Sequence, residues 1–116
     1  MPETGENLNG VQTQGENIAD NGGLKESYKA YKENVSDEPR LPGLNLTADQ
    51  MFFLTFGQVW CSSYRPEGVT SRILSGVHSP GRYRVIGTMQ NNEVFAKAFN
   101  CPPTSYMNPP DKCNVW

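Results

Sequence analysis

Two acidic residues near the start of the chain, Glu16 and Asp20, stand four positions apart. On a helix this spacing places both carboxylates on one face, where they repel each other unless a cation or a cationic imidazole lies in front of them. One such arrangement uses Glu16 as a direct zinc ligand and Asp20 as the acceptor for a zinc-bound histidine. The alternative, in which Glu16 caps the helix and Asp20 is solvated, is the commoner role of acids at this spacing.

His78 is the only histidine, and the chain contains no HExxH motif. A zinc site built from two histidines and one glutamate therefore needs ligands from outside this sequence. Because His78 precedes Ser-Pro-Gly on a predicted turn, it is expected to be exposed and could donate to a developing oxyanion. An ordinary surface histidine is the alternative.

Two arginines, Arg82 and Arg84, alternate with apolar residues in and beside a segment of strand-forming residues at 83–86. Alternation on a strand places both guanidinium groups on one side. One of them could bind a peptide carbonyl or carboxylate through its fork of donors, or both could simply face solvent.

Capping patterns and apolar periodicity predict two longer helices. The first, over 13–35, begins with the capping-box spacing Thr13-Gln-Gly-Glu and follows an extended lead-in over 1–12. The second, over 48–63, follows a capping box and is apolar nearly all round, which is typical of the interior of something large. Val59 and Trp60 on this helix are either ordinary core or the wall of an apolar pocket.

The second half of the chain is expected to contain shorter elements and an irregular tail. A short helix over about 67–75 precedes the turn and the strand, and Asn91 could cap a last helix that runs through Phe99. The proline-rich tail after Phe99 lies between two cysteines, so we expect it to be irregular and covalently tied. The predicted fold class is therefore mainly α with a short strand or extended segment.

The composition excludes some classes of protein. The 116 residues are enough for one small domain or for part of a larger one. Ten Lys and Arg against twelve Asp and Glu give a net charge of -2, so there is no basic surplus to neutralise nucleic-acid phosphates. The longest apolar stretch, 51–56, is too short to span a bilayer, and no signal peptide is visible at the start.

The three cysteines are an odd number, so in a secreted protein at least one pairs outside this chain or stays free. Two glycosylation sequons, at Asn34 and Asn45, mildly favour a secretory route together with these cysteines.

A set of motifs runs in order through residues 8–116. They are Gly15-Glu-Asn-Ile-Ala-Asp-Asn-Gly-Gly-Leu24, Leu41-Pro-Gly-Leu44, Phe52-Phe-Leu54, Gln58-Val-Trp-Cys61, Tyr64-Arg-Pro-Glu67, His78-Ser-Pro-Gly-Arg82, Phe99-Asn-Cys101, Tyr106-Met-Asn-Pro109 and Cys113-Asn-Val-Trp116. The ordered set closely resembles the carboxy-terminal segment of the neprilysin/endothelin-converting-enzyme family of zinc metallopeptidases. Several of these motifs are individually specific.

The resemblance implies a role for four polar residues. Glu16 matches the third zinc ligand, which follows the two histidines of HExxH, and Asp20 matches the acid that orients a zinc-bound histidine. His78 matches the histidine that stabilises the tetrahedral transition state. Arg84 matches the arginine that binds the substrate backbone on the primed side.

The remaining matches concern the pocket and the cysteines. Val59 and Trp60 match the wall of the S1′ pocket, which in this family favours bulky hydrophobic residues. Cys61, Cys101 and Cys113 match cysteines whose disulfide partners lie upstream, outside this chain.

As a whole, the resemblance implies that 1–116 is the C-terminal, helical part of one thermolysin-like catalytic domain, with 78–116 forming the transition-state loop, a short helix and a disulfide-tied tail. The implied activity is hydrolysis of short peptides on the amino side of bulky hydrophobic residues, at one zinc ion whose other ligands and general base belong to an HExxH outside this chain.

Family members are mostly single-pass cell-surface ectoenzymes or secreted proteins, so the partners implied are the rest of the peptidase, short peptides, and a membrane only through a segment absent here. Alone, this chain is expected to be inactive and to fold poorly. The alternative is a truncated, inactive relative that acts as a binding or decoy module.

Overall fold

The computed structural model describes residues 5, 7–35 and 38–115. All regular secondary structure in these ranges is helical, and strands are absent from them. The helices are α1 (Gly10–Asn34), α2 (Ala48–Val59), α3 (Pro66–Ser75), α4 (Gly81–Asn91) and α5 (Glu93–Ala98). The mainly α fold class is confirmed. None of the helices in the described part is long and apolar enough to cross a membrane.

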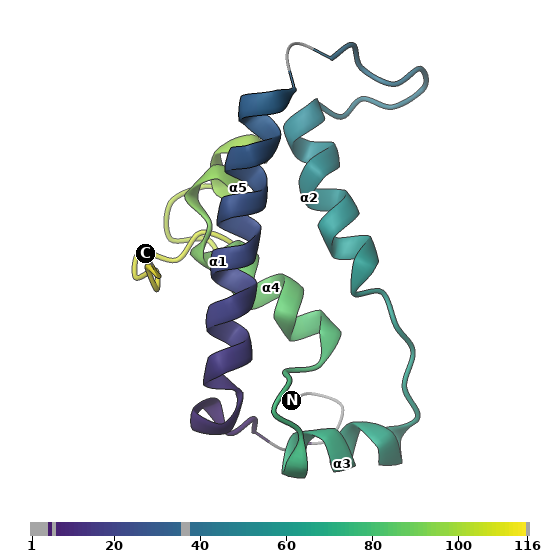
Figure 1. Ribbon diagram of the computed structural model, residues 1–116, viewed down its shortest axis with the longest axis vertical. Helices are drawn as coiled ribbons and strands as arrows, with labels where there is room; N and C mark the ends of the chain where they lie inside the picture. The colour runs from purple at the N-terminus through teal and green to yellow at the C-terminus, as the bar shows by residue number, and fades with distance from the viewer. Residues whose placement is uncertain (1–4, 6, 36–37, 116) are drawn as a thin grey trace.

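The arrangement is a small bundle built around α1 (Figure 1). Helices α1 and α2 run along the long axis, and α3 lies crosswise at one end. Helix α4 packs against α1, and α5 packs against α4 and α2. The chain therefore leaves α2, passes through α3, and returns to α1 through the segment that contains His78.

Helix α1 begins three residues earlier than predicted, at Gly10 rather than at 13. The side chain of Asn9 is the N-cap, and it accepts hydrogen bonds from the backbone N–H groups of Val11 and Gln12 at 3.1 and 3.3 Å. Asparagine is among the best N-cap residues because its side-chain oxygen satisfies donors that the first turn leaves unpaired. The expected capping box at Thr13 is therefore wrong. Thr13 lies in the first turn and is buried.

The capping box of α2 is confirmed. Thr47 Oγ1 accepts from the N–H of Gln50 at 3.2 Å, and the N–H of Thr47 donates to Gln50 Oε1 at 2.9 Å. Gln50 Nε2 also donates to the carbonyl of Ala98, which ties α2 to the end of α5. The helix ends at Val59, four residues before the predicted end at 63.

Aromatic side chains hold the helices together. Phe53 is fully buried, and its ring meets that of Phe95 edge-to-face with centroids 5.4 Å apart. Tyr28 of α1 stacks on Phe53 at the same centroid distance. Leu24 and Met89 complete this core, so α1, α2, α4 and α5 share one hydrophobic cluster. Such aromatic pairs stabilise a fold beyond the area they bury.

The strand predicted over 83–86 is wrong, because these residues lie inside α4. Four strand-forming residues are a weak signal beside the helical spacing of Val85 and Met89, which both pack on the core. Residues two apart on a helix do not face the same side. The prediction that Arg82 and Arg84 share one side is therefore also wrong.

Helix α3 is confirmed over nearly its predicted length. Pro66 occupies the first helical position, where its missing N–H costs nothing. Ile73 is its buried side chain.

The cap of α5 is Asn92 rather than Asn91, and its Oδ1 accepts from the N–H of Phe95 at 2.9 Å. Asn91 instead links two other segments. Its Nδ2 donates to Asn21 Oδ1 on α1 at 3.0 Å, and its Oδ1 accepts from the N–H of Cys113 in the tail at 3.1 Å.

The tail after Phe99 is irregular, as expected. Hydrogen bonds attach it to α4, since Lys112 Nζ donates to the carbonyl of Gln90 and Gln90 Nε2 donates to the carbonyl of Tyr106, both at 2.6 Å. Cys61, Cys101 and Cys113 are all free thiols in this structure.

Parts of four predictions lie outside the described residues. These parts are residues 1–4 and 6 of the lead-in, residues 36–37 of the loop after α1, Ser36 of the Asn34 sequon, and Trp116 of the closing motif.

Candidate functional site

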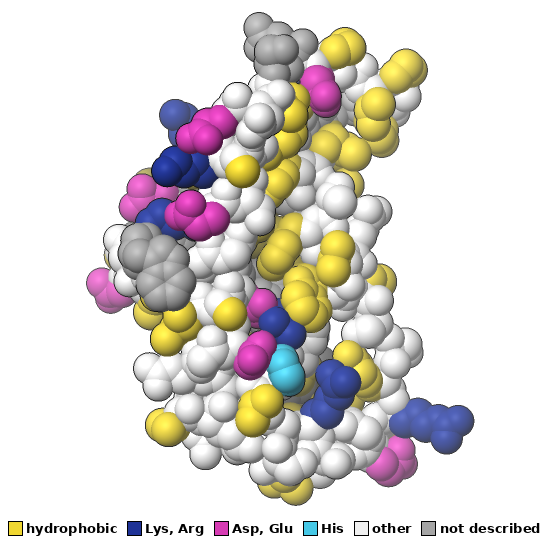
Figure 2. All heavy atoms as spheres, in the orientation of Figure 1, with side chains coloured by type: hydrophobic (Ala, Val, Ile, Leu, Met, Phe, Trp, Pro, Cys, Tyr) yellow, Lys and Arg dark blue, Asp and Glu magenta, His cyan; other side chains and the backbone are white. Residues whose placement is uncertain are grey.

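The structure brings Glu16 and His78 together from segments 62 positions apart. His78 Nε2 lies 3.1 Å from Glu16 Oε2, and the two side chains are 51% and 41% exposed. Figure 2 shows this single histidine on an open face, with acidic side chains to its left and basic side chains above it and to its right. Because Asn9 caps α1, the interpretation of Glu16 as a helix cap is wrong. Its carboxylate is open to a ligand from outside the chain.

Asp20 is bound by Arg84 rather than solvated. Arg84 Nε donates to Asp20 Oδ2 at 2.6 Å, and Arg84 Nη2 donates to Asp20 Oδ1 at 2.5 Å. The side chains of Arg84 and Asp20 are only 12% and 8% exposed. The hydrogen bonds to Asp20, together with the charges of Asp20 and Glu16, raise the pKa of Arg84 above its ordinary value despite its burial. Glu16 is therefore flanked by a fixed cation, with Arg84 Nη2 3.9 Å from its Oε2.

Trp60 supports the other side of Arg84. The guanidinium carbon lies 3.8 Å from the centroid of the indole ring, a cation–π contact. Gly81 makes this approach of α4 to Trp60 possible, since a Cβ on Gly81 would lie 2.6 Å from the Trp60 carbonyl oxygen. The guanidinium of Arg84 thus has a carboxylate at one edge and an aromatic face against its plane.

These groups surround a hollow of about 390 Å³. Its lining includes His78, Arg84, Trp60, Tyr64, Arg72 and Ser79. Arg72 stacks on the Tyr64 ring with its guanidinium carbon 4.8 Å from the centroid, and it donates to the Tyr64 hydroxyl at 3.2 Å. The hollow is therefore polar and positively charged on the sides formed by α3 and α4.

A partly buried chain of hydrogen bonds lies directly beside Glu16 and His78. Ser79 Oγ donates to Asn17 Oδ1 at 2.8 Å, and Asn17 Nδ2 donates to Thr13 Oγ1 at 3.1 Å. Ser79 and Thr13 are only 5% and 2% exposed. Asn17 and Ser79 were not predicted from the sequence as site residues. The only signal was that Asn17 and Ser79 directly follow two candidate site residues, and this does not reveal that they meet.

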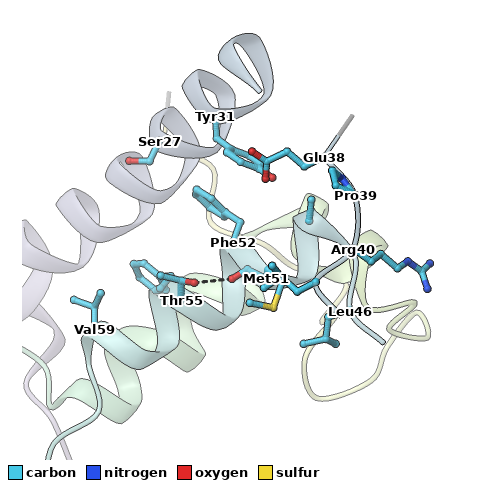
Figure 3. A pocket seen from close by; sticks show the side chains of 13 residues that line it. Ser27, Tyr31, Glu38, Pro39, Arg40, Leu46, Met51, Phe52, Thr55 and Val59 are labelled. Atoms are coloured by element: carbon cyan, nitrogen blue, oxygen red, sulfur yellow. Dashed lines mark hydrogen bonds between the residues drawn. The ribbon is translucent and has the colours of Figure 1, made fainter. Parts of the chain in front are cut away.

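Val59 does not line the same hollow as Trp60. It is 72% exposed and lies beside a second hollow of about 510 Å³ between the end of α1, α2 and the loop before α2. Figure 3 shows Val59 and Met51 along α2, with Tyr31 of α1 and Pro39 of the loop across from them. The lining is mainly apolar. A joint wall formed by Val59 and Trp60 is therefore not present in this structure.

The described residues do not form a complete metal site by themselves. Within the described ranges, His, Cys, Asp and Glu side chains form no group of three or more that could hold a metal ion. Glu16 fits the role of one metal ligand in a site whose other ligands come from outside this chain. Its carboxylate is partly exposed and does not cap the helix. Asp20 fits the role of a hydrogen-bond acceptor for a metal-bound imidazole, since each carboxylate oxygen bonded to Arg84 keeps a second lone pair for another donor.

The predicted cysteines and sequon asparagines do not line the hollow beside His78 and Arg84. Cys61 and Cys113 are exposed and Cys101 is half-buried. Asn34 and Asn45 of the two sequons are both exposed. The side chains of both asparagines are therefore accessible. The disulfide pairing of the cysteines and the glycosylation of the asparagines stay predictions.

Comparison with known families decides the membership of this chain. The model of peptidase family M13 matches residues 1–115. The chain belongs to peptidase family M13. Within this family, it is 54% identical to human neprilysin over 115 residues and 56% identical to neprilysin-2 of Drosophila melanogaster over 116 residues. It is 53% identical to human endothelin-converting enzyme 1.

These M13 alignments cover 97% of the chain but only 15% of each relative. The chain therefore spans about one seventh of the length of the curated relatives it matches. A solved structure, the "Haemonchus galactose containing glycoprotein complex", superposes with a TM-score of 0.87 and 43% identity over 94% of this chain and 20% of that one. The sequence alignments and the structural superposition both match this chain to one part of a longer protein.

Proposed function

We propose that this chain is the C-terminal part of the catalytic domain of a zinc metalloendopeptidase, which we call the parent peptidase. Membership of peptidase family M13 supports the reaction class, and a mouse relative that is 52% identical carries the name membrane metallo-endopeptidase-like 1. The observation that carries the proposal is the meeting of Glu16 and His78, with Nε2 and Oε2 3.1 Å apart. Asp20 and Arg84 lie beside them as a bonded pair.

Glu16 is the residue of this chain that would hold the zinc ion. The two histidine ligands and the general-base glutamate would come from an HExxH elsewhere in the parent peptidase, because this chain contains one histidine and no such motif. When bound, the metal would supply Lewis-acid polarisation of the scissile carbonyl and an activated water. Asp20 would accept a hydrogen bond from a liganding imidazole and so fix the orientation of that ring.

His78 would donate an N–H to the oxyanion that develops as the peptide bond is attacked. Its side chain is half-exposed and borders the hollow, so a substrate could reach it. Donors of this kind act mainly in the transition state and therefore affect turnover more than binding.

Arg84 would bind a backbone carbonyl of the substrate. Asp20 and Trp60 fix its guanidinium group, which keeps N–H donors beyond the two that Asp20 accepts. Because the fork is already ordered before substrate arrives, less entropy is lost on binding.

The proposed substrates are short peptides cleaved before a bulky hydrophobic residue. Trp60 would form the apolar wall for that residue, since it borders the hollow beside His78 and Arg84. Val59 lines the other hollow. It would therefore share a pocket wall with Trp60 only if other parts of the parent peptidase join the two hollows. We also propose a cell-surface or secreted location, with Cys61, Cys101 and Cys113 paired to cysteines elsewhere in the parent peptidase and with glycans on Asn34 and Asn45.

Replacing the proposed ligand in the parent peptidase tests this function. Glu16→Gln should abolish zinc retention and peptide hydrolysis together, because an amide is a far weaker zinc donor than a carboxylate. The matched control is Glu26→Gln, an exposed acid further along α1. A Glu16→Gln protein that retains one zinc per chain and full activity would overturn the assignment.

A further inference from the structure

Glu16 and His78 are both partly exposed. The proposed chemistry nevertheless requires a fixed distance between their side chains. Catalytic groups are productive only within about 0.5 Å of the required geometry. The contact between Nε2 and Oε2 cannot by itself supply that precision, since both side chains are open to solvent. Some buried structure beside them must set their spacing.

The backbone around His78 does not supply it. Among the described residues, Val77, His78 and Ser79 make no backbone–backbone hydrogen bond to any other segment. The nearest backbone hydrogen bonds lie at the ends of the segment, where the N–H of Gly76 donates to the carbonyl of Arg72 and the carbonyl of Pro80 accepts from α4. The polar contacts that join this segment to α1 therefore come from side chains.

The bond between Ser79 and Asn17 is placed to hold this segment against α1. It joins the residue after His78 to the residue after Glu16, with Ser79 Oγ 2.8 Å from Asn17 Oδ1. Neighbouring Cα atoms are about 3.8 Å apart, so fixing Ser79 against Asn17 fixes the backbone of both site residues to within one peptide unit. Ser79 is 5% exposed, so water competes little for this bond.

Thr13 sets the direction of the Asn17 amide. Asn17 Nδ2 donates to Thr13 Oγ1 at 3.1 Å, which turns Oδ1 toward Ser79. Thr13 Oγ1 in turn donates to the carbonyl of Asn9, the cap residue of α1, at 3.3 Å. The chain of bonds thus runs from the helix cap to the His78 segment.

We infer that Asn17 and Ser79 are positioning residues of the peptidase site, whose hydrogen bond sets the separation of Glu16 and His78. This inference rests on the proposed function, because it gives the spacing a catalytic purpose. Neither residue touches the reacting atoms.

The test uses Ser79→Ala in the parent peptidase, with Ser75→Ala as the matched control. Ser75 is exposed, and its hydroxyl donates only within its own helix, to the carbonyl of Ser71. Ser79→Ala should lower kcat about 10- to 100-fold, which is the scale of loss from misplacing a catalytic group by about 1 Å. KM should stay within about twofold and zinc content should not change, because Arg84, Trp60 and Glu16 are untouched.

Two further variants separate positioning from simple loss of stability. Ser79→Thr keeps the hydroxyl and should recover most of the lost kcat. The double variant Asn17→Ala with Ser79→Ala should be hardly slower than the worse single variant, because both remove one bond. A kcat for Ser79→Ala within about twofold of the original, additive losses, or a loss that follows the folded or zinc-loaded fraction would overturn the inference.

A crystal structure of the Ser79→Ala protein gives a readout that does not require activity. We expect His78 to lie more than about 0.5 Å from its original place relative to Glu16. An unchanged separation would overturn the positioning role even in an active enzyme. Complete absence of zinc-dependent hydrolysis by the unmodified parent peptidase would instead overturn the proposed function.

Discussion

Arg84 and Asp20, which are 64 positions apart in sequence, form a two-pronged ion pair between α4 and α1, with donor–acceptor distances of 2.6 and 2.5 Å. This pair locks α4 onto α1 directly beside Glu16. It also gives the nearly buried carboxylate of Asp20 a hydrogen-bonded partner of opposite charge, which a buried carboxylate requires. The pair links the packing of the helices to the proposed chemistry.

Asp20→Asn in the parent peptidase should have two effects. Zinc affinity should fall roughly 10- to 100-fold, as is typical when a residue that orients a metal ligand is lost. Stability should fall by about 3 kcal/mol, because Arg84 would be left buried without its charge partner. Competition with a fluorescent chelator measures the first effect and chemical denaturation the second.

The control for Asp20 is Asp49→Asn. Asp49 pairs with Lys32 at 3.2 Å, but this pair is 33% and 51% exposed. Its loss should cost less than about 1 kcal/mol and leave zinc affinity unchanged. Equal effects of the two substitutions would show that Asp20 has no special relation to the site.

His78→Ala in the parent peptidase should slow turnover about 10²- to 10³-fold while zinc is retained, the usual cost of losing one oxyanion donor. KM should change little. Steady-state kinetics with a peptide substrate, together with metal analysis of the same sample, measure both quantities. Unchanged kcat would mean that the contact between His78 and Glu16 has no role in the reaction.

Tyr28 makes stability depend on pH in the alkaline range. Burial against the core, helped by a hydrogen bond to Asp49 and the negative charge of Asp49, raises the pKa of Tyr28 to about 12. The folded state therefore favours the neutral phenol. Its contribution to stability is fully present below the unfolded pKa of about 10, and it is lost as pH rises from about 10 to 12.

Tyr28→Phe should remove this component. The difference in unfolding free energy between the original and the Tyr28→Phe parent peptidase should be constant from pH 8 to about pH 9 and should then shift in favour of the variant. Denaturation curves at a series of pH values measure it. A difference that stays flat up to pH 11 would mean that the Tyr28 phenol is not perturbed by folding.

Much of the fold follows from local signals in the sequence. The capping box of Thr47 and Gln50 acts within a few residues, and it marked the start of α2 correctly. The start of α1 was misplaced because Asn9 and Thr13 are both good caps, and only burial of Thr13 decides between them. The residues at 83–86 became helical because Val85 packs on a core that other helices build.

The candidate site also has a part that the sequence predicts and a part that it does not. Glu16, Asp20, His78 and Arg84 were proposed as site residues from residue type and from the family resemblance. Their mutual geometry was not predictable from spacing, because Arg84 reaches Asp20 only when α4 lies against α1. The bond between Asn17 and Ser79 was missed for the same reason. The expectation that the isolated chain folds poorly stays a prediction.

Two glycines of the same helix provide a final comparison. A Cβ at Gly81 would lie 2.6 Å from the Trp60 carbonyl oxygen, whereas a Cβ at Gly87 would have no atom of the described residues within 4 Å, apart from its own neighbours in the helix. Gly81→Ala must therefore move the start of α4 away from Trp60. Because Arg84 lies three residues further along this helix, the cation–π contact and the bonds to Asp20 should be disturbed as well.

In the parent peptidase, we expect Gly81→Ala to lower stability by about 1–3 kcal/mol, the usual cost of a forced overlap, and to lower kcat/KM. Gly87→Ala should instead raise stability by about 0.5–1 kcal/mol, since alanine loses less entropy in a helix. Thermal unfolding and peptide kinetics on the two variants test this contrast. If both substitutions stabilise the protein and leave kcat/KM unchanged, the close approach of α4 to Trp60 does not shape the site, and Arg84 must be held by Asp20 alone.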